Sequence, residues 1–177
     1  MGRATELRVL KDALSATGAE RRARYVAITG QAGIGKSRLA WELEKYVDGL
    51  VEPVYLHRGR SPAYGEGIAY WALGEMLRSR VGLLETDPPG EAATKLSAAL
   101  EAYVADQEDR RWIEPHLRIL LGLEGPTGGD RNEQFGAWRR FFEAVATRGT
   151  TVLVGEAQAA RTGSRRRSWG ARPSSVC

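Results

Sequence analysis

The sequence predicts a three-layer α/β fold in which a helical insertion separates the second strand from the third. Three short apolar runs, at residues 25–29, 54–56 and 150–154, have the length and composition of buried strands. Between the last two runs, apolar residues recur every three or four positions, which is typical of amphipathic helices. Strands that alternate with helices favour a parallel sheet covered by helices.

Each element follows from its own pattern. Leu7, Leu10 and Leu14 share one face of a helix over residues 5–16, and a polar linker over 18–24 leads to the first strand. A second helix starts at Lys36, with apolar residues at every fourth position, and the strand at 54–56 follows Pro53. Glycines and prolines predict loops over 58–67, 87–90 and 125–129, and between them we expect helices at 68–81, 91–105, 111–121 and 133–148. The last of these helices should direct its large side chains inward: Phe135, Trp138, Phe141, Phe142 and Val145.

Composition excludes several classes of protein. The 177 residues, 42% hydrophobic and 27% charged, suit one globular domain rather than a disordered or fibrous chain. The one cysteine, Cys177, cannot form an intramolecular disulfide or a cysteine-based zinc site. The charged N-terminus and the absence of a long apolar run predict a cytoplasmic protein without a membrane partner.

The chemistry is concentrated in one motif of eight residues between the first strand and the second helix. Its sequence satisfies G-x-x-x-x-G-K-[ST], the phosphate-binding P-loop or Walker A pattern, in the strand–loop–helix context that this pattern requires. Glycines let successive backbone N–H groups surround a phosphate at the positive end of the following helix. The lysine supplies a charge for the β- and γ-phosphates, and the serine hydroxyl a ligand for Mg²⁺. The candidate nucleotide-binding residues are Gly30, Gln31, Ala32, Gly33, Ile34, Gly35, Lys36 and Ser37.

The wider sequence resembles a family. The segments that carry the resemblance are Gly2-Arg3 with Glu6-Leu7, the run GQAGIGKSRL over 30–39, and the 64–67 loop ahead of Trp71. Together they look like the AAA-like, STAND-type P-loop ATPase module of bacterial signalling regulators, which is found attached to adenylate or guanylate cyclase domains or to LuxR-type DNA-binding domains. The resemblance covers residues 2–154 and implies ATP and Mg²⁺ as cofactors, with an output domain or protein partner outside these residues.

The sequence departs from the family after its third strand. In the family, that strand ends in a Walker B pair of acidic residues, one that holds magnesium and one that orients the attacking water. Here Glu156 takes the magnesium position, but Ala157 takes the place of the catalytic acid. The later strand, sensor residue, arginine finger and helical lid that the family implies have no counterpart in the residues that follow. We therefore expect an incomplete P-loop NTPase fold that retains Ser37 and Glu156 as metal ligands and has lost hydrolysis.

Residues 155–177 differ in composition from residues 1–154. Five arginines oppose one glutamate in this tail, so the tail accounts for the whole net charge of +4. We interpret residues 1–154 as a partial P-loop ATPase domain and residues 155–177 as a disordered basic tail, either the product of an out-of-frame reading or a truncated copy. A nucleic-acid or membrane-surface function of the tail is the alternative. The lack of interleaved aromatic residues argues against it.

Other residues have weaker claims to function. His57, His116 and Asp12 have no partner at catalytic or metal-ligand spacing, so we interpret them as surface or locally bonded residues. Tyr64, Trp71 and the aromatic residues at 135–142 have the chemistry to stack on a base, but helical spacing favours a core role.

The sequence thus predicts ATP–Mg²⁺ binding in a fragment of a regulatory ATPase. Two alternatives stay open: a small P-loop kinase that transfers phosphate to a metabolite, and a non-enzymatic adaptor that binds a partner protein through its helices. Nucleic acid is not an expected partner, because residues 1–154 carry no net charge.

Overall fold

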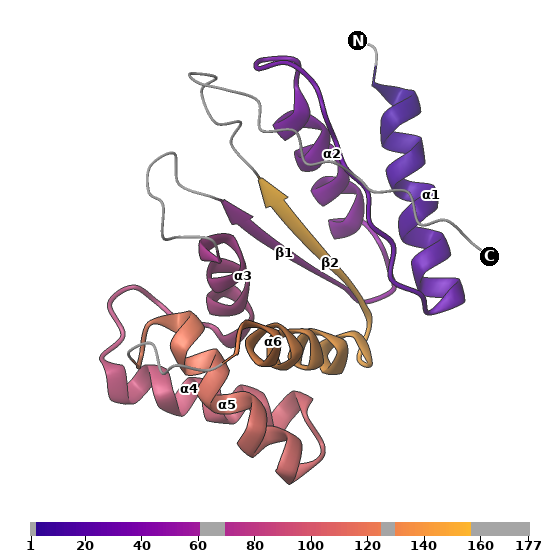
Figure 1. The fold of residues 1–177 in the computed structure, drawn as a ribbon. Coiled ribbons are helices and arrows are strands. Elements are labelled where there is room, and N and C mark those ends of the chain that lie inside the picture. The colour runs from indigo at the N-terminus through magenta and orange to yellow at the C-terminus, as the bar shows by residue number, and fades with distance from the viewer. Residues whose placement is uncertain (1–2, 61–69, 125–129, 157–177) are drawn as a thin grey trace, which may run out of the picture.

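The computed structural model describes residues 3–60, 70–124 and 130–156 (Figure 1). Within these ranges it contains helices on both faces of a two-stranded parallel sheet. In chain order the elements are α1 (Ala4–Glu20), α2 (Lys36–Asp48), β1 (Val54–Arg60), α3 (Trp71–Val81), α4 (Pro89–Tyr103), α5 (Gln107–Leu121), α6 (Arg131–Ala146) and β2 (Thr150–Glu156).

The sheet consists of β1 and β2, which pair in parallel from Val54 opposite Thr150 to Arg60 opposite Glu156. On one face, Arg58 of β1 forms an ion pair with Glu44 of α2, with 3.2 Å between Nη1 and Oε1. The other face packs against α3 so closely that a Cβ on Gly59 would lie 1.9 Å from the carbonyl oxygen of Ala72. The mixed α/β class is therefore confirmed, and the architecture is compatible with an incomplete P-loop NTPase fold.

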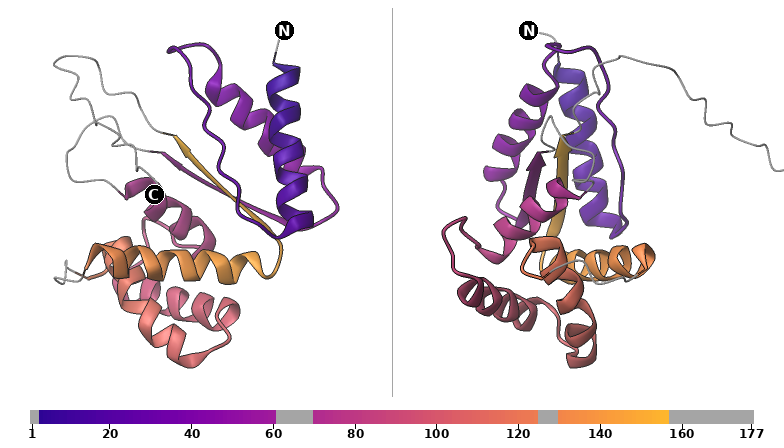
Figure 2. Two further views of the ribbon diagram at one scale, coloured as in Figure 1. Left: turned by 45° about the vertical axis from the view of Figure 1, so that its right-hand side comes forward. Right: turned by 60° about the vertical axis from the view of Figure 1, so that its left-hand side comes forward.

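The predicted strand at 25–29 is wrong. In the described chain these residues lie in an extended segment that joins no ladder. Tyr25 is 92% exposed, Val26 44% and Ile28 37%. A strand this apolar in a parallel sheet is normally covered on both faces and paired with neighbouring strands. Neither β1 nor β2 pairs with the segment at 25–29. Figure 1 and both views of Figure 2 show the segment running from the end of α1 to the P-loop, on the β2 side of the sheet.

The predicted helices are present, with shifted ends. α5 and α6 begin earlier than expected because aspartates cap them: Asp106 accepts from the Asp109 N–H at 2.8 Å, and Asp130 from the Asn132 N–H at 3.2 Å. α1 runs to Glu20 and ends at Arg21, whose φ of 51° is left-handed, so the first part of the predicted linker is helical. β1 and β2 each extend beyond the predicted strands, to residues 60 and 156.

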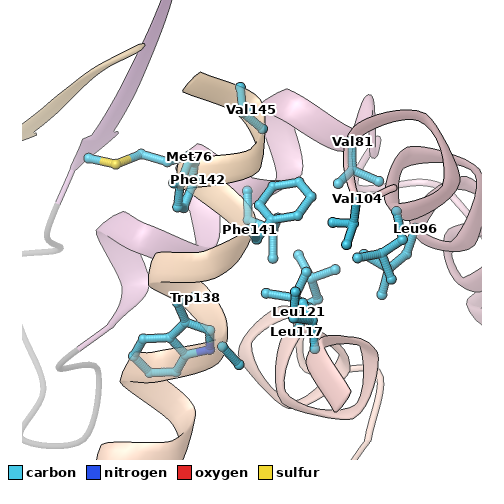
Figure 3. Packing of buried hydrophobic residues seen from close by; sticks show 14 residues of the cluster. Met76, Val81, Leu96, Val104, Leu117, Leu121, Trp138, Phe141, Phe142 and Val145 are labelled. Atoms are coloured by element: carbon cyan, nitrogen blue, oxygen red, sulfur yellow. The ribbon is translucent and has the colours of Figure 1, made fainter. Parts of the chain in front are cut away.

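The main hydrophobic core lies between α3, α4, α5 and α6 (Figure 3). Phe141 of α6 is fully buried, and in Figure 3 it points toward Val81 of α3, Leu121 of α5 and Val104, the residue that follows α4. Trp138, Phe142 and Val145 are buried on the same helix, as predicted, but Phe135 is 45% exposed and packs edge-on against Tyr70. The predicted helical insertion between the strands is thus present in the structure as a layer with its own core.

His57 connects the sheet to this helical layer. Its side chain is 1% exposed, lies 5.8 Å from the Phe142 ring, and accepts a hydrogen bond at Nε2 from Arg80 Nε at 3.3 Å. Arg80 also donates to the Tyr103 hydroxyl and stacks over the Tyr55 ring. His57 is therefore a buried, cross-linked residue, and the interpretation as a surface or locally bonded residue is wrong for it. His116 is bonded locally, with 2.8 Å between Nδ1 and the Trp112 carbonyl oxygen.

This burial predicts an acid-sensitive fold. Burial, with a smaller contribution from the Arg80 charge, lowers the pKa of His57 from 6.5 to about 4. As the pH falls from 6.5, the unfolded chain binds a proton that the folded chain does not, so the free energy of unfolding decreases, by about 2 kcal/mol at pH 5. Urea unfolding at pH 7 and pH 5 should show a smaller pH effect in His57→Gln than in the wild type. His116→Gln is the matched control and should keep the wild-type effect, whereas an unchanged pH effect in His57→Gln would contradict the assignment.

Candidate functional site

The P-loop is a tight turn between the extended segment and α2. Gly33 and Gly35 have φ values of 77° and 94°, which side-chain-bearing residues rarely adopt. Gly35 is also the N-cap residue of α2, and the first turn of the helix begins at Lys36. The glycine positions of the motif are thus required by the backbone path that it takes.

Lys36 folds back across this turn. Its Nζ donates to the carbonyl oxygens of Gly30 at 3.0 Å and Gln31 at 2.9 Å. An ammonium group has three donors, so these two bonds leave one for a ligand. The charge of Lys36 is therefore held over the loop, where it can meet an anion.

The start of α2 supplies backbone donors at the same place. The first N–H groups of a helix have no carbonyl partner within it, and they carry its positive partial charge. The first intrahelical bond of α2 runs from the Leu39 N–H to the Gly35 carbonyl, at 3.1 Å. Ser37, in the first turn, is exposed. The loop has the donors and the charge for a phosphate, with a hydroxyl beside them.

Arg3 adds a second cation beside the loop. Its guanidinium Nη2 donates to the Ile34 carbonyl and so ties the start of α1 to the P-loop. Between them lies a groove of about 360 Å³ whose lining combines apolar and charged residues. It is lined by Arg3, Ala4, Leu7, Ile34, Gly35, Arg38, Leu39 and Glu42. Arg3 was not among the predicted site residues, although Gly2-Arg3 was part of the resemblance and was therefore a usable signal.

A small apolar cluster between α1 and α2 supports the loop. Leu10 of α1 packs with Leu39 and Leu43 of α2, and Lys11 lies over the Tyr46 ring at 4.1 Å. The strand that was expected to carry the loop does not form. The P-loop is consequently positioned by the packing of α2 against α1, two helices that run side by side in the same direction (Figure 1).

The predicted magnesium ligands come from two elements. Ser37 belongs to α2, and Glu156 is the last residue of β2. Figure 1 shows the P-loop and the carboxyl ends of both strands at the same end of the molecule, as expected for ligand sites in parallel α/β sheets. Hydroxyl and carboxylate oxygens suit Mg²⁺, so the two residues fit the ion by chemistry. In the described parts of the chain, no group of three or more His, Cys, Asp or Glu side chains is arranged to hold a metal.

The eight predicted loop residues are therefore brought together in one turn, and their role in binding stays a prediction. Tyr64 and residues 157–177, which include Ala157 and most of the basic tail, lie outside the described residues. The tail predicted to begin at residue 155 is wrong at its start, because Gly155 and Glu156 belong to β2. Trp71 is 48% exposed, and its indole N–H donates to Glu75 of the same helix, away from the groove residues.

A family model described as an AAA ATPase domain matches residues 1–167. The chain belongs to this family. Searches of curated proteins and of solved structures gave no match. The predicted AAA-like ATPase module is confirmed at the level of the family, and membership in it supports a nucleotide as the ligand of the P-loop. No helix among the described residues of this AAA ATPase domain has the length and apolar character to cross a membrane.

Proposed function

We propose that the AAA ATPase domain binds ATP with Mg²⁺ at residues 30–37 and acts as a nucleotide-dependent module of a bacterial signalling regulator. The observation that carries the proposal is the position of Lys36 over the glycine turn at the start of α2. The phosphates would contact the N–H groups of this turn, the helix end and the lysine, as in other P-loops.

The groove beside the loop is the proposed binding site for the nucleoside. Ile34 and Leu7 in its lining supply apolar contacts for a nucleobase, and Arg3 and Glu42 carry a donor and an acceptor. A pocket that combines apolar side chains with a few polar groups is typical of small-ligand sites. The groove favours a nucleotide over a simple phosphate.

Ser37 and Glu156 would hold the Mg²⁺, which when bound neutralises charge between the phosphates. We expect no hydrolysis, because Ala157 stands where the family has the acidic residue that orients the attacking water. We therefore propose a cytoplasmic binding module with little or no turnover. Its partial ATPase domain extends to the end of β2 at Glu156, past the predicted boundary at residue 154, and the basic tail follows.

Replacing Lys36 tests the binding site. We expect Lys36→Ala to weaken ATP binding by roughly 1.5–3 kcal/mol, the contribution of a charge-assisted hydrogen bond. Titration with a fluorescent ATP analogue in the presence of Mg²⁺ measures it. Lys45→Ala is the matched control, since Lys45 lies on the same helix but stacks on Trp41. Equal affinity of wild type and Lys36→Ala would remove Lys36 from the site, and no binding by the wild type would favour the adaptor alternative.

Turnover is the second test. We expect purified protein with intact ATP binding to release phosphate at a negligible rate, because Ala157 stands where the family has the acid that orients the attacking water. Phosphate release is measured with a coupled assay, and Lys36→Ala serves as the blank. Release well above this blank would show that another residue, such as Glu156, activates water. Phosphate transfer to an added metabolite would instead support the kinase alternative.

A further inference from the structure

The peptide group between Ile34 and Gly35 is held from outside the P-loop. Its carbonyl oxygen accepts the hydrogen bond from the Arg3 guanidinium, and a Cβ on Gly35 would lie 3.9 Å from Arg3 Nε, so the guanidinium lies against this peptide. Arg3 is itself fixed, because it is the N-cap residue of α1 and its own carbonyl accepts from the Leu7 N–H at 3.0 Å. The contact therefore joins the start of α1 to the loop that precedes α2.

The orientation of this peptide decides which of its two polar groups faces a ligand. The described chain contains no cis peptide bond, so the Gly35 N–H points opposite to the Ile34 carbonyl and away from Arg3. Gly35 is left-handed, with φ 94° and ψ 28°, and Lys36 begins the right-handed helix. Successive residues of opposite hand turn their N–H groups into one concavity that suits an anion. The Gly35 N–H thus joins the N–H groups at the start of α2.

The rest of the loop constrains this peptide weakly. A flip of the peptide changes only the two dihedral angles beside it, and one of them belongs to Gly35, which tolerates positive and negative φ about equally. Lys36 Nζ donates to the carbonyl groups of residues 30 and 31, in the first half of the loop. A flipped peptide would present a carbonyl oxygen to the phosphate in place of an N–H, and the two negative groups would repel each other.

We propose that Arg3 is a positioning residue for the phosphate site: by holding the Ile34 carbonyl, it keeps the Gly35 N–H directed at the bound phosphate. The inference rests on the proposed nucleotide site and adds a residue that acts on this site through the loop backbone. It does not depend on a contact between Arg3 and the nucleobase. The position of the start of α1 is thereby coupled to the affinity of the loop for an anion.

Calorimetric titration of the full chain with inorganic pyrophosphate and with ATP, each with Mg²⁺, tests the proposal, because pyrophosphate has no base or ribose. Arg3→Met keeps the aliphatic stem and removes the donors. We expect it to weaken pyrophosphate binding by roughly 3- to 10-fold, the contribution of one hydrogen bond, and ATP binding at least as much.

Two variants complete this titration. Arg3→Lys retains a donor and should recover most of the affinity. Arg8→Met is the matched control, since Arg8 is exposed on the same helix, and it should bind both ligands like the wild type. An unchanged affinity for pyrophosphate in Arg3→Met would overturn the proposal, whether or not ATP binding falls.

The order parameter of the Gly35 N–H, measured by ¹⁵N relaxation on the free protein, separates this role from a direct contact of Arg3 with phosphate. We expect a rigid value of roughly 0.85 in the wild type and in Arg8→Met, and a value below about 0.6 in Arg3→Met. An unchanged order parameter would overturn the proposal even if the affinities fall, because a residue that only contacts phosphate leaves the free loop unaltered. If the wild type binds neither ATP nor pyrophosphate, the proposed function fails, and the order parameter alone then supports or overturns the hold of Arg3 on the peptide.

Discussion

The parallel pairing of β1 with β2 is the contact on which the rest of the structure depends. A parallel ladder needs a crossover that covers the sheet, and here the crossover is the whole segment from residue 61 to residue 149. Its helices α3–α6 bury their apolar faces against one another and so form the largest core of the domain. Gly59 allows α3 to approach β1 at backbone distance, and the Arg80–His57 hydrogen bond joins the sheet to this layer.

The candidate site is held in place by other elements than the sheet and its crossover. The P-loop, the groove and Arg3 belong to the pair of packed helices α1 and α2, which has its own small cluster around Leu10, Leu39 and Leu43. The ion pair between Arg58 and Glu44 links α2 to the sheet. An anion site of this kind needs a glycine turn, a helix start and a lysine, which are all local in sequence. The phosphate cradle can therefore form even though residues 25–29 lie outside the ladder.

The sequence predicted what depends on local pattern. The helices were found from their apolar spacing, and the loop was found from residues 30–37, because those signals do not require distant partners. The prediction of a strand at 25–29 was wrong. The apolar composition of this segment indicates a preference for burial, whereas a strand forms only where a neighbouring strand pairs with it. His57 gave no signal either, since its burial depends on Arg80 and Phe142, which are 23 and 85 residues away in the chain. Asp106 and Asp130 are recognisable N-cap residues, and attention to them would have placed the starts of α5 and α6 correctly.

The phosphate loop is held by the packed helices α1 and α2 and not by a strand of the sheet. Hydrogen exchange of the full chain, with and without ATP and Mg²⁺, tests it most directly. We predict rapid exchange of the amides at 25–29 in both conditions, strong protection of the helices α4–α6, and slower exchange at residues 33–38 when the nucleotide is added. Strong protection across residues 25–29 in the absence of nucleotide would show that this segment is paired in a sheet and would contradict the account.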